Sequence, residues 1–175
     1  MRKVRFSVAA SLDGYIAGPG GEFVWIPEDP TVDFAEIFAG VDTVLLGRRS
    51  YEITQNGPPW TAGTRVYVFS RTLRAEDHPG VTMVAENAGA VVAALRQEAG
   101  GHIWLFGGGA LFGSLLAEGQ VDTVEVTVVP ILLGGGVPLI PSGAPRTFLL
   151  LTGTHAYPSG MVSLTYSVQR DKGSD

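Results

Sequence analysis

Two hydrophobic patterns divide this chain. In the first part, short apolar runs alternate with stretches whose apolar positions recur every three or four residues, which is the spacing of a helix. The apolar runs predict buried strands at 4–10, 43–46, 65–70, 81–85 and 103–106. The helical spacing predicts a short helix around 34–38 with Thr31 as its cap, and longer helices over 87–99 and 111–117. Glycines at 100, 101 and 119 are expected to end the two longer helices.

The last third of the chain has a different period. Apolar and polar residues alternate over 123–128 and again over 162–169, a pattern typical of half-buried strands. Strands that alternate with helices, followed by strands alone, predict an α/β fold with a mixed, mostly parallel central sheet and antiparallel C-terminal strands. The sequence contains no linker or repeat, so we expect residues 1–175 to form one domain with a disordered tail at 171–175.

Composition and charge narrow the classes of function. Hydrophobic residues make up 45% of the 175 residues and charged residues 17%, which excludes a disordered chain. The net charge of −5 and the pI near 5.1 argue against nucleic acid as a partner. Apolar stretches are too short to span a membrane. We expect a cytoplasmic protein, with which the lack of cysteine is compatible. The chain has no cysteine, which excludes thiol catalysis, and we expect no metal site.

A glycine turn is the first candidate for chemistry. Residues 103–106 form an apolar run that leads through Gly107, Gly108 and Gly109 into the predicted helix at 111–117. Such a turn suits a pyrophosphate, because glycines let the backbone approach an anion and a helix start offers free N–H groups. The spacing does not match G-x-G-x-x-G, since Phe112 stands where the third glycine would be, and we reject a Rossmann site. A tight turn without any ligand is the equally weighted alternative.

Two further strand ends carry residues that suit an anion. Gly47, Arg48, Arg49 and Ser50 follow one predicted strand, and the run from Ser70 through Arg71 to Thr72 follows another. Arginine matches phosphate with two parallel hydrogen bonds, and ligands of open α/β sheets gather beyond the carboxyl ends of strands. Alone, each segment is as well explained by a solvated basic turn. Together with the glycine turn they indicate one phosphate-binding edge.

The same segments resemble a known family. In order along nearly the whole chain, five motifs are similar to those of the dihydrofolate reductase superfamily, and more closely to the branch that contains the reductase domain of the bifunctional riboflavin-biosynthesis enzyme. They are SLDGYIA at 11–17 with Trp25 after it, DTVLLGRRSY at 42–51, VFSRT at 68–72, LFGGGA at 105–110, and the stretch from VD at 121–122 through Pro130 to GGGVPL at 134–139. The resemblance implies a three-layer α/β/α fold and an NADPH-dependent reductase. The chain lacks the cysteines of a zinc deaminase segment.

The resemblance also implies which residues hold NADPH. The phosphates would be bound by Gly47, Arg48, Arg49 and Ser50, and the 2′-phosphate by Ser70 and Arg71 with Thr72 beside them. The pyrophosphate would lie at the strand end and helix start formed by Phe106, Gly107, Gly108, Gly109, Ala110 and Leu111. Ala9 and Ala10 would border the nicotinamide. Ile16, Ala17 and Trp25 would belong to the loop over the site, where Trp25 would contact the substrate or serve only as packing.

Carboxylates are the candidates for proton transfer. Asp13 follows the first strand, where it would face the pocket or cap the turn before Gly14. Asp33 and Glu36 lie in the region where dihydrofolate reductases carry an acidic residue, and the simpler interpretation of both is a solvated helix carboxylate. We take Asp13 and Asp33 as the catalytic candidates.

The expected activity is hydride transfer from NADPH to a C=N or C=O bond of a small pteridine-, pyrimidine- or riboflavin-precursor-like substrate. Three alternatives remain: a xenobiotic reductase of the same fold, a protein that binds NADPH without turnover as a sensor or sequestering module, and a structural domain whose glycine turns hold nothing. The resemblance further implies a homodimer.

Overall fold

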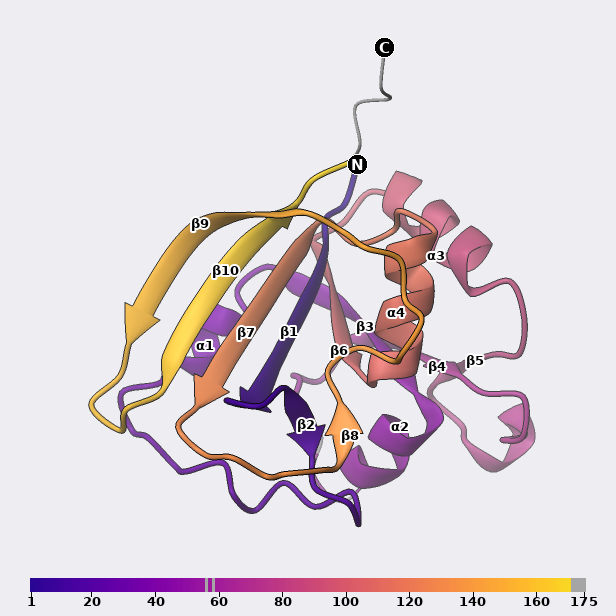
Figure 1. The fold of residues 1–175 in the computed structure, drawn as a ribbon. Coiled ribbons are helices and arrows are strands. Elements are labelled where there is room, and N and C mark those ends of the chain that lie inside the picture. The colour runs from indigo at the N-terminus through magenta and orange to yellow at the C-terminus, as the bar shows by residue number, and fades with distance from the viewer. Residues whose placement is uncertain (56, 58, 171–175) are drawn as a thin grey trace.

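The computed structural model describes residues 1–55, 57 and 59–170, and an eight-stranded sheet runs through this part of the chain (Figure 1). The strand order is β5-β4-β3-β6-β1-β7-β10-β9. Neighbouring strands from β5 to β7 are parallel, and β10 and β9 join antiparallel at one side. Their bounds are β1 Val4–Ser11, β3 Val41–Gly47, β4 Arg65–Phe69, β5 Thr82–Val84, β6 His102–Gly107, β7 Thr123–Val129, β9 Leu149–Ala156 and β10 Val162–Val168. The predicted mixed sheet is confirmed, while the expected disorder of 171–175 lies outside the described residues.

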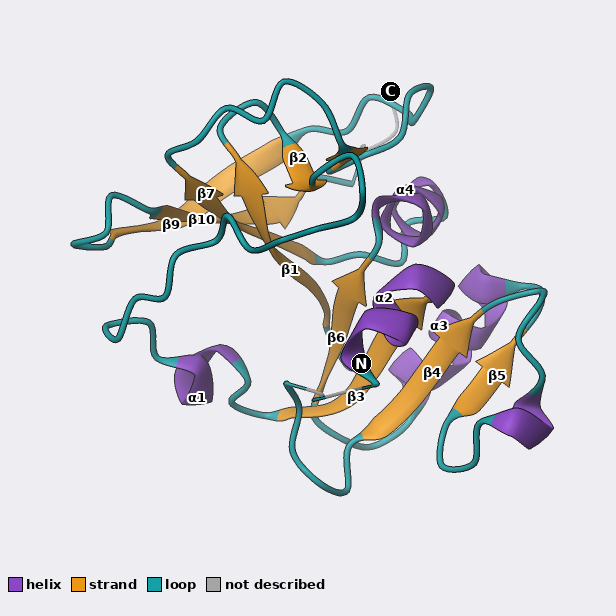
Figure 2. Cartoon of the chain, turned by 90° about the horizontal axis from the view of Figure 1, so that it is seen from below, coloured by secondary structure: helices purple, strands orange, loops and turns teal. Residues whose placement is uncertain are grey.

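Helices lie on both faces of this sheet. On one face, α3 (Ala88–Gln97) and α4 (Gly109–Ala117) pack against β1, β3 and β6. On the other face lie α1 (Phe34–Ile37) and α2 (Arg48–Thr54), as the view from below shows (Figure 2). This is the predicted three-layer architecture. A second, two-stranded sheet joins β2 (Tyr15–Ala17) to β8 (Val137–Pro138), and a short 3-10 helix covers Ala75–Asp77. No helix in the part of the chain that the structure describes is long and apolar enough to cross a membrane.

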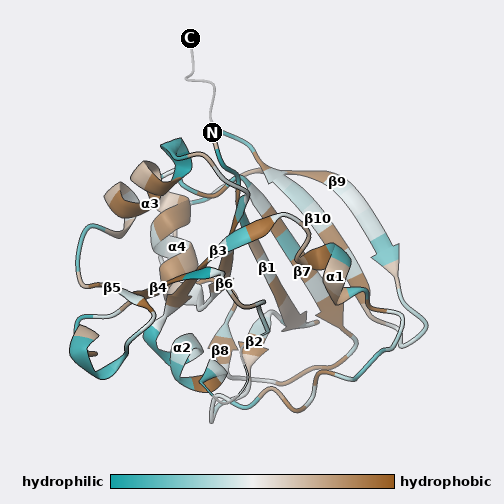
Figure 3. Cartoon of the chain, turned by 180° about the vertical axis from the view of Figure 1, so that it is seen from behind, coloured by the Kyte–Doolittle hydropathy of each residue, from teal (hydrophilic) through white to brown (hydrophobic). Residues whose placement is uncertain are grey.

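The main core lies between the sheet and the α3–α4 layer. Phe6 of β1 is fully buried and stacks on Phe112 of α4, with ring centroids 3.8 Å apart. Leu105 of β6 and Leu115 of α4 are fully buried in the same cluster. Figure 3 colours α4 mostly brown, for hydrophobic residues, in keeping with its burial. This packing holds the helix that starts at the glycine turn against the centre of the sheet.

Several local predictions need correction. Thr31 does not cap α1: the cap is Asp33, whose carboxylate accepts a hydrogen bond from the Glu36 backbone N–H at 3.0 Å, and the Thr31 hydroxyl instead donates to Asp29. The last two helices begin and end within a few residues of the predicted bounds. Strand β9 was not predicted, because its sequence, LLLTGTHA, has no regular alternation and the strand is exposed on both faces.

A buried charge cluster closes the amino-terminal end of β1. The Arg96 and Asp122 side chains, 5% and 9% exposed, form an ion pair at 2.9 Å, and Asp122 also accepts from the Val4 backbone N–H. Arg170 reaches the same carboxylate at 3.0 Å. Asp122 therefore caps the start of β1, and it also joins α3 to the C-terminal end of the described chain. These contacts lie at the opposite end of β1 from the predicted site.

We predict that Phe112→Ala lowers the free energy of unfolding by about 3–5 kcal/mol, because it removes the ring stacked on Phe6 and leaves a cavity in a close-packed core. Urea denaturation followed by circular dichroism measures this loss. Phe23→Ala is the control, since the Phe23 side chain is about half exposed (49%) in the β2–α1 loop. Equal losses in the two variants would show that the stack is not a main stabilising contact.

Candidate functional site

The three predicted anion-binding segments lie along one edge of the sheet. Strands β4, β3, β6 and β1 are parallel neighbours in that order, so their carboxyl ends meet at the same edge. Residues 47–50 begin at the last residue of β3, residues 70–72 follow β4, and residues 107–109 begin at the last residue of β6. Figure 2 shows α2 and α4 next to each other at these strand ends. The tertiary structure therefore brings together segments that are separated by up to 60 residues in the sequence.

The glycine turn opens directly onto a helix start. Gly107 has φ +147°, a conformation that side chains rarely adopt, and the peptide between Gly107 and Gly108 is cis. Helix α4 begins at Gly109, and its N-cap residue, Gly108, has no side chain to satisfy the first N–H groups of the helix. These groups have no partner inside the helix and carry its partial positive charge. The turn therefore offers backbone donors to an anion without a side chain in the way.

Gly109 is needed for a close contact with the second sheet. A Cβ atom added at this position would lie 2.6 Å from the backbone oxygen of Pro138 in β8. In addition, the Leu139 backbone N–H donates to the Gly14 oxygen at 2.9 Å, which joins the chain after β8 to the loop after β1. Any residue other than glycine at position 109 would therefore push β8 and these loops away from the turn.

The start of α2 lies against the glycine turn. A Cβ atom added at Gly107 or Gly108 would have the Ser50 hydroxyl oxygen as its nearest neighbour, at 3.5 and 3.6 Å. A Cβ atom at Gly47 would lie 3.5 Å from the Gly108 backbone nitrogen. The start of α2 therefore lies close to the glycine turn, and the Ser50 hydroxyl and the Gly108 backbone N–H lie where the two segments meet. The hydroxyl and the backbone N–H groups are donors of the kind that bind a phosphate group.

Arg48 connects α2 to the loop after β4. Its guanidinium group donates to the Thr72 hydroxyl at 3.1 Å and pairs with Glu52 one turn further along the helix at 2.8 Å. The Ser70 hydroxyl oxygen accepts from the backbone N–H groups of Thr72 and Leu73, at 3.2 and 3.0 Å, and so shapes that loop. Arg49 and Arg71, which neighbour Arg48 and Thr72 in the sequence, are exposed. The segment at 47–50 thus contacts both of the others: Arg48 reaches the segment at 70–72, and Ser50 lies beside the glycine turn at 107–109.

Other predicted cofactor residues are divided between surface and core. Ala10 and Leu111 are buried in the core, at 2% and 9% exposure, so their side chains pack against other core residues, and their part in cofactor binding stays a prediction. Ile16 is half-buried and packs against the same core. The remaining predicted positions are at least partly exposed, apart from Gly107 and Gly109: Ala9, Ala17, Phe106, Gly108 and Ala110. Strand alternation explains the difference between the alanines, since neighbouring residues of β1 point to opposite faces.

The Asp13 carboxylate holds two loops together. It accepts hydrogen bonds from the Ser11 hydroxyl at 2.6 Å and from the backbone N–H groups of Leu133 and Gly134 at 3.1 and 2.7 Å. The hydrogen bond from Ser11 has the largest effect on the pKa of Asp13. Together with the two backbone bonds it outweighs desolvation and lowers that pKa below its ordinary value. Asp13 is thus a charged acceptor near neutral pH, a poor source of protons, and its catalytic role stays a prediction.

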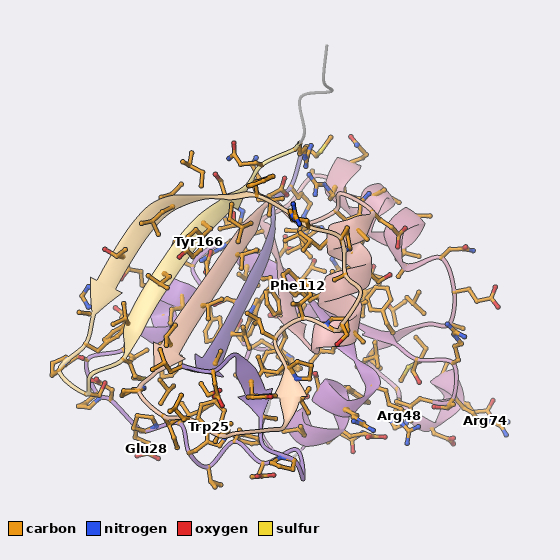
Figure 4. All side chains as sticks on the ribbon, viewed as in Figure 1. Trp25, Glu28, Arg48, Arg74, Phe112 and Tyr166 are labelled. Carbon is orange, nitrogen blue, oxygen red and sulfur yellow. The ribbon has the colours of Figure 1, made fainter. Side chains whose placement is uncertain are left out.

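The β2–α1 loop is anchored at its far end by another carboxylate. Asp29 is buried and accepts from the Thr31 backbone and hydroxyl, at 2.8 and 2.5 Å, and from the Ser159 backbone N–H at 3.3 Å. Hydrogen bonds from Ser159 and then from Thr31 lower the pKa of Asp29 to about 2. Trp25 lies in this loop, below β2 in Figure 4, and its indole N–H donates to the Glu22 oxygen at 3.1 Å. Asp33 follows in the same segment, where it is exposed and caps α1.

Sequence reasoning missed a polar group on the sheet itself. Arg5 of β1 and Glu125 of β7 form a bidentate ion pair with N···O distances of 2.8 and 3.0 Å, and their side chains are 22% and 14% exposed. Ser7 and Thr127 continue this polar row on the same face, and Thr127 is the partner of Ala9 in the sheet register. In Figure 3 this part of β1 runs between α1 and α2. The sequence feature that could have revealed this pair is that Arg5 and Glu125 are the only charged residues in strands β1 and β7.

Comparison with known proteins identifies the family of this chain. The model of the RibD C-terminal domain family matches residues 2–163. YwjB of Bacillus subtilis is 35% identical over 162 residues, which cover 89% of this chain and 92% of that protein. A putative riboflavin biosynthesis protein from Shewanella sp. PV-4 superposes with a TM-score of 0.81 at 28% identity, covering 97% of this chain and 100% of the other.

A more distant structure shares the fold. Dihydrofolate reductase from Enterococcus faecalis, solved in complex with NADP(H) and RAB-propyl, superposes with a TM-score of 0.71 at 16% identity, covering 96% of this chain and 97% of that one. The chain thus has the dihydrofolate reductase-like α/β fold. Within that fold it belongs to the RibD C-terminal domain family, and the resemblance seen in the five sequence motifs is confirmed.

We predict that Asp13→Asn lowers the Tm at pH 7. Asparagine has an amide nitrogen in place of one carboxylate oxygen, and this nitrogen cannot accept a hydrogen bond, so the bond from Leu133 or the bond from Gly134 is lost. Since the pKa of Asp13 is lowered by folding, its stabilising contribution is complete above the ordinary carboxyl pKa of about 4 and is lost as the pH falls below that value. The Tm difference between the two proteins should therefore shrink from pH 5 to pH 2. A difference that stays constant over this range would contradict the charged role of Asp13.

Proposed function

We propose that this chain is a cytoplasmic NADPH-dependent reductase that transfers hydride to a C=N or C=O bond of a small pteridine-, pyrimidine- or riboflavin-precursor-like substrate. The observation that carries the proposal is the continuous edge formed by three segments: the glycine turn at 107–109 borders Ser50, and Arg48 of the same helix reaches Thr72. Membership in the RibD C-terminal domain family supports the same function.

The residues of this edge fit the phosphates of a dinucleotide. The open glycine turn and the first N–H groups of α4 suit a pyrophosphate, which needs close approach and backbone donors. Arg48, Arg49 and Arg71 add positive charge to an edge of a chain whose net charge is −5. In this arrangement Ser70 and Arg71 would hold the 2′-phosphate, which distinguishes NADPH from NADH.

The chain's own part in the reaction would be to bind, orient and protonate. Bound NADPH supplies the hydride. Ala9, a small half-buried residue at the end of β1, leaves space where a flat ring could approach the sheet. The polar row of Ser7, Thr127 and the Arg5–Glu125 pair lies on the same face and offers donors and acceptors to the edge of a heterocycle. Proton delivery would come from a carboxylate or from ordered water.

A second candidate function is NADPH binding without turnover. It is favoured by the contacts of the two candidate proton donors. Asp13 accepts hydrogen bonds from two loop N–H groups and Asp33 caps a helix, so both carboxylates already have structural roles. The two functions differ in one measurable property. Consumption of NADPH, followed by its absorbance in the presence of dihydrofolate, a riboflavin intermediate or a panel of carbonyl compounds, would occur only with a reductase, and the active substrate would separate a biosynthetic from a xenobiotic role.

Nucleotide binding is the direct test of the proposed site. In isothermal titration calorimetry we expect micromolar or tighter binding of NADPH and weaker binding of NADH. Absence of heat with both nucleotides, in a protein whose circular dichroism shows it to be folded, would rule out the proposed function and its alternative together.

We further predict that Arg71→Ala weakens NADPH binding about tenfold or more and leaves NADH binding nearly unchanged, because hydrogen bonds to charged groups contribute about 1.5–3 kcal/mol. The matched control is Arg74→Ala, since Arg74 lies on the same loop, is exposed and pairs with Glu76. Equal losses for the two nucleotides in Arg71→Ala, or an equal effect of Arg74→Ala, would show that Arg71 does not contact the 2′-phosphate.

A further inference from the structure

The side of the sheet that faces away from α4 is where a substrate of the proposed reductase would lie. Ala9, which would border the nicotinamide, points to this side, because its neighbours Val8 and Ala10 pack in the α4 core. A group that receives hydride must lie next to the nicotinamide and therefore near Ala9. We call this surface the substrate face, and alternate residues of β6, β1 and β7 form it: Trp104, Arg5, Ser7, Ala9, Glu125 and Thr127.

Aromatic side chains line one side of the substrate face. The ring of Phe38 packs against Trp104 with centroids 4.4 Å apart, and the ring of Phe34 lies 6.2 Å from that of Phe38. The indole N–H of Trp104 donates to the Ser7 backbone oxygen at 3.3 Å, which joins this row to β1. Phe34 is 62% exposed, so the row ends in a ring that a ligand can contact. The faces of aromatic rings carry partial negative charge, so they attract flat apolar groups and not anions.

The polar groups on the other side of the substrate face carry no net charge. Both carboxylate oxygens of Glu125 accept from the Arg5 guanidinium, so the two charges neutralise one another. Thr127 lies beside Ala9 in the sheet register, and Thr165 of β10 lies beside Glu125. Hydroxyl groups donate and accept hydrogen bonds, which suits the amino, carbonyl and hydroxyl substituents of a heterocycle.

The chain segment that leads over this side carries only negative charge. Figure 3 shows α1 on this side of β7. Residues 6–47, which include the β2–α1 loop and α1, contain no Lys, Arg or His. The acidic residues of this segment are Asp13, Glu22, Glu28, Asp29, Asp33, Glu36 and Asp42. The start of α1 offers nothing to an anion, because the Asp33 carboxylate already caps it. An anion approaching here would be repelled without a compensating cation.

Within the described part of the chain, the other basic residues lie elsewhere. One group lies near the amino-terminal ends of the parallel strands: Arg2, Lys3, Arg65, Arg96 and Arg170. A second group belongs to α2 and to the loop after β4, where the nucleotide is proposed to bind: Arg48, Arg49, Arg71 and Arg74. Arg146 lies in the segment between β8 and β9, which passes α4 in Figure 1. His155 is on β9, three strands from β1 and thus about 14 Å away.

We infer, on the basis of the proposed function, that the substrate is a heterocycle that carries neither a phosphate nor a carboxylate group. Its ring would lie beside Ala9 and Phe34, and its amino or hydroxyl substituents would bind the hydroxyls of Ser7 and Thr127. A phosphorylated sugar on the same ring would extend over a surface whose arginine is already paired. Glu125 is thus a specificity-determining residue, because it neutralises Arg5 and so excludes anions.

Two compounds that differ by one phosphate test this inference. A ribosylaminouracil and its 5′-phosphate are titrated by calorimetry into protein saturated with NADP⁺, which cannot donate hydride. We expect the unphosphorylated compound to bind about tenfold more tightly or better. Equal or tighter binding of the phosphate, or no heat with either compound in a protein that binds NADP⁺, would overturn the inference. Absence of NADP⁺ binding is a different result, which rules out the proposed function itself.

Glu125→Gln tests whether this carboxylate excludes anions. The substitution leaves the Arg5 charge uncompensated, so affinity for the 5′-phosphate should rise about tenfold or more, while affinity for the unphosphorylated compound changes less. The matched control is Glu36→Gln, which removes one negative charge from the exposed surface of α1 without freeing an arginine. An equal effect of the two substitutions, or no gain in a folded Glu125→Gln protein, would contradict the role of Glu125.

A second variant keeps the test decisive if circular dichroism shows that Glu125→Gln does not fold. Phe34→Arg places a cation at an exposed position beside the substrate face, where it should raise affinity for the 5′-phosphate about tenfold. Phe34→Gln is its control, because it removes the same ring and adds no charge. If Phe34→Arg gained no more affinity for the phosphate than Phe34→Gln, missing positive charge would not be the reason for the preference.

Discussion

The pairing of β6 with β1 on one side and β3 on the other is the constraint on which the rest of the structure depends. All three strands are parallel, so their carboxyl ends lie together, and each is followed by a segment of the proposed site. Burial of Leu105 and Leu45 on one face and of Trp104 and Val44 on the other determines how the strands align. A register shift of one residue would exchange these faces and expose the core.

Carboxylates hold the loops in place around this rigid centre. Asp13 binds the turn at 133–134, and Asp29 binds the β9–β10 hairpin through Ser159. Each accepts several hydrogen bonds, which keeps it ionised, and an ionised carboxylate forms stronger bonds to N–H groups than a neutral one. Acidic residues that follow strands or lie in loops of such a fold can therefore be structural, even where they stand close to a binding edge.

Much of the fold and part of the site could be predicted from local pattern. The apolar runs of β1, β3, β4 and β6 and the alternation in β7 and β10 marked these strands, because burial on two faces or one produces those patterns. Strand β9 escaped prediction because it is exposed on both sides, so no burial pattern is imposed on it. The burial of Ala10 and Leu111 could not be predicted from the motifs, because a motif gives the position of a residue, whereas the direction of its side chain depends on packing.

The sequence by itself determined the chemistry at each strand end: three glycines that admit a close approach, and arginines and hydroxyls of the kind that can bind phosphate. Only the tertiary structure decided which of these groups meet. Ser50 borders the turn at 107–108, Arg48 reaches Thr72, and Arg5 pairs with Glu125 across 120 positions. The physical reason is that sheet order is set by which faces can be buried together, and that choice involves the whole chain at once.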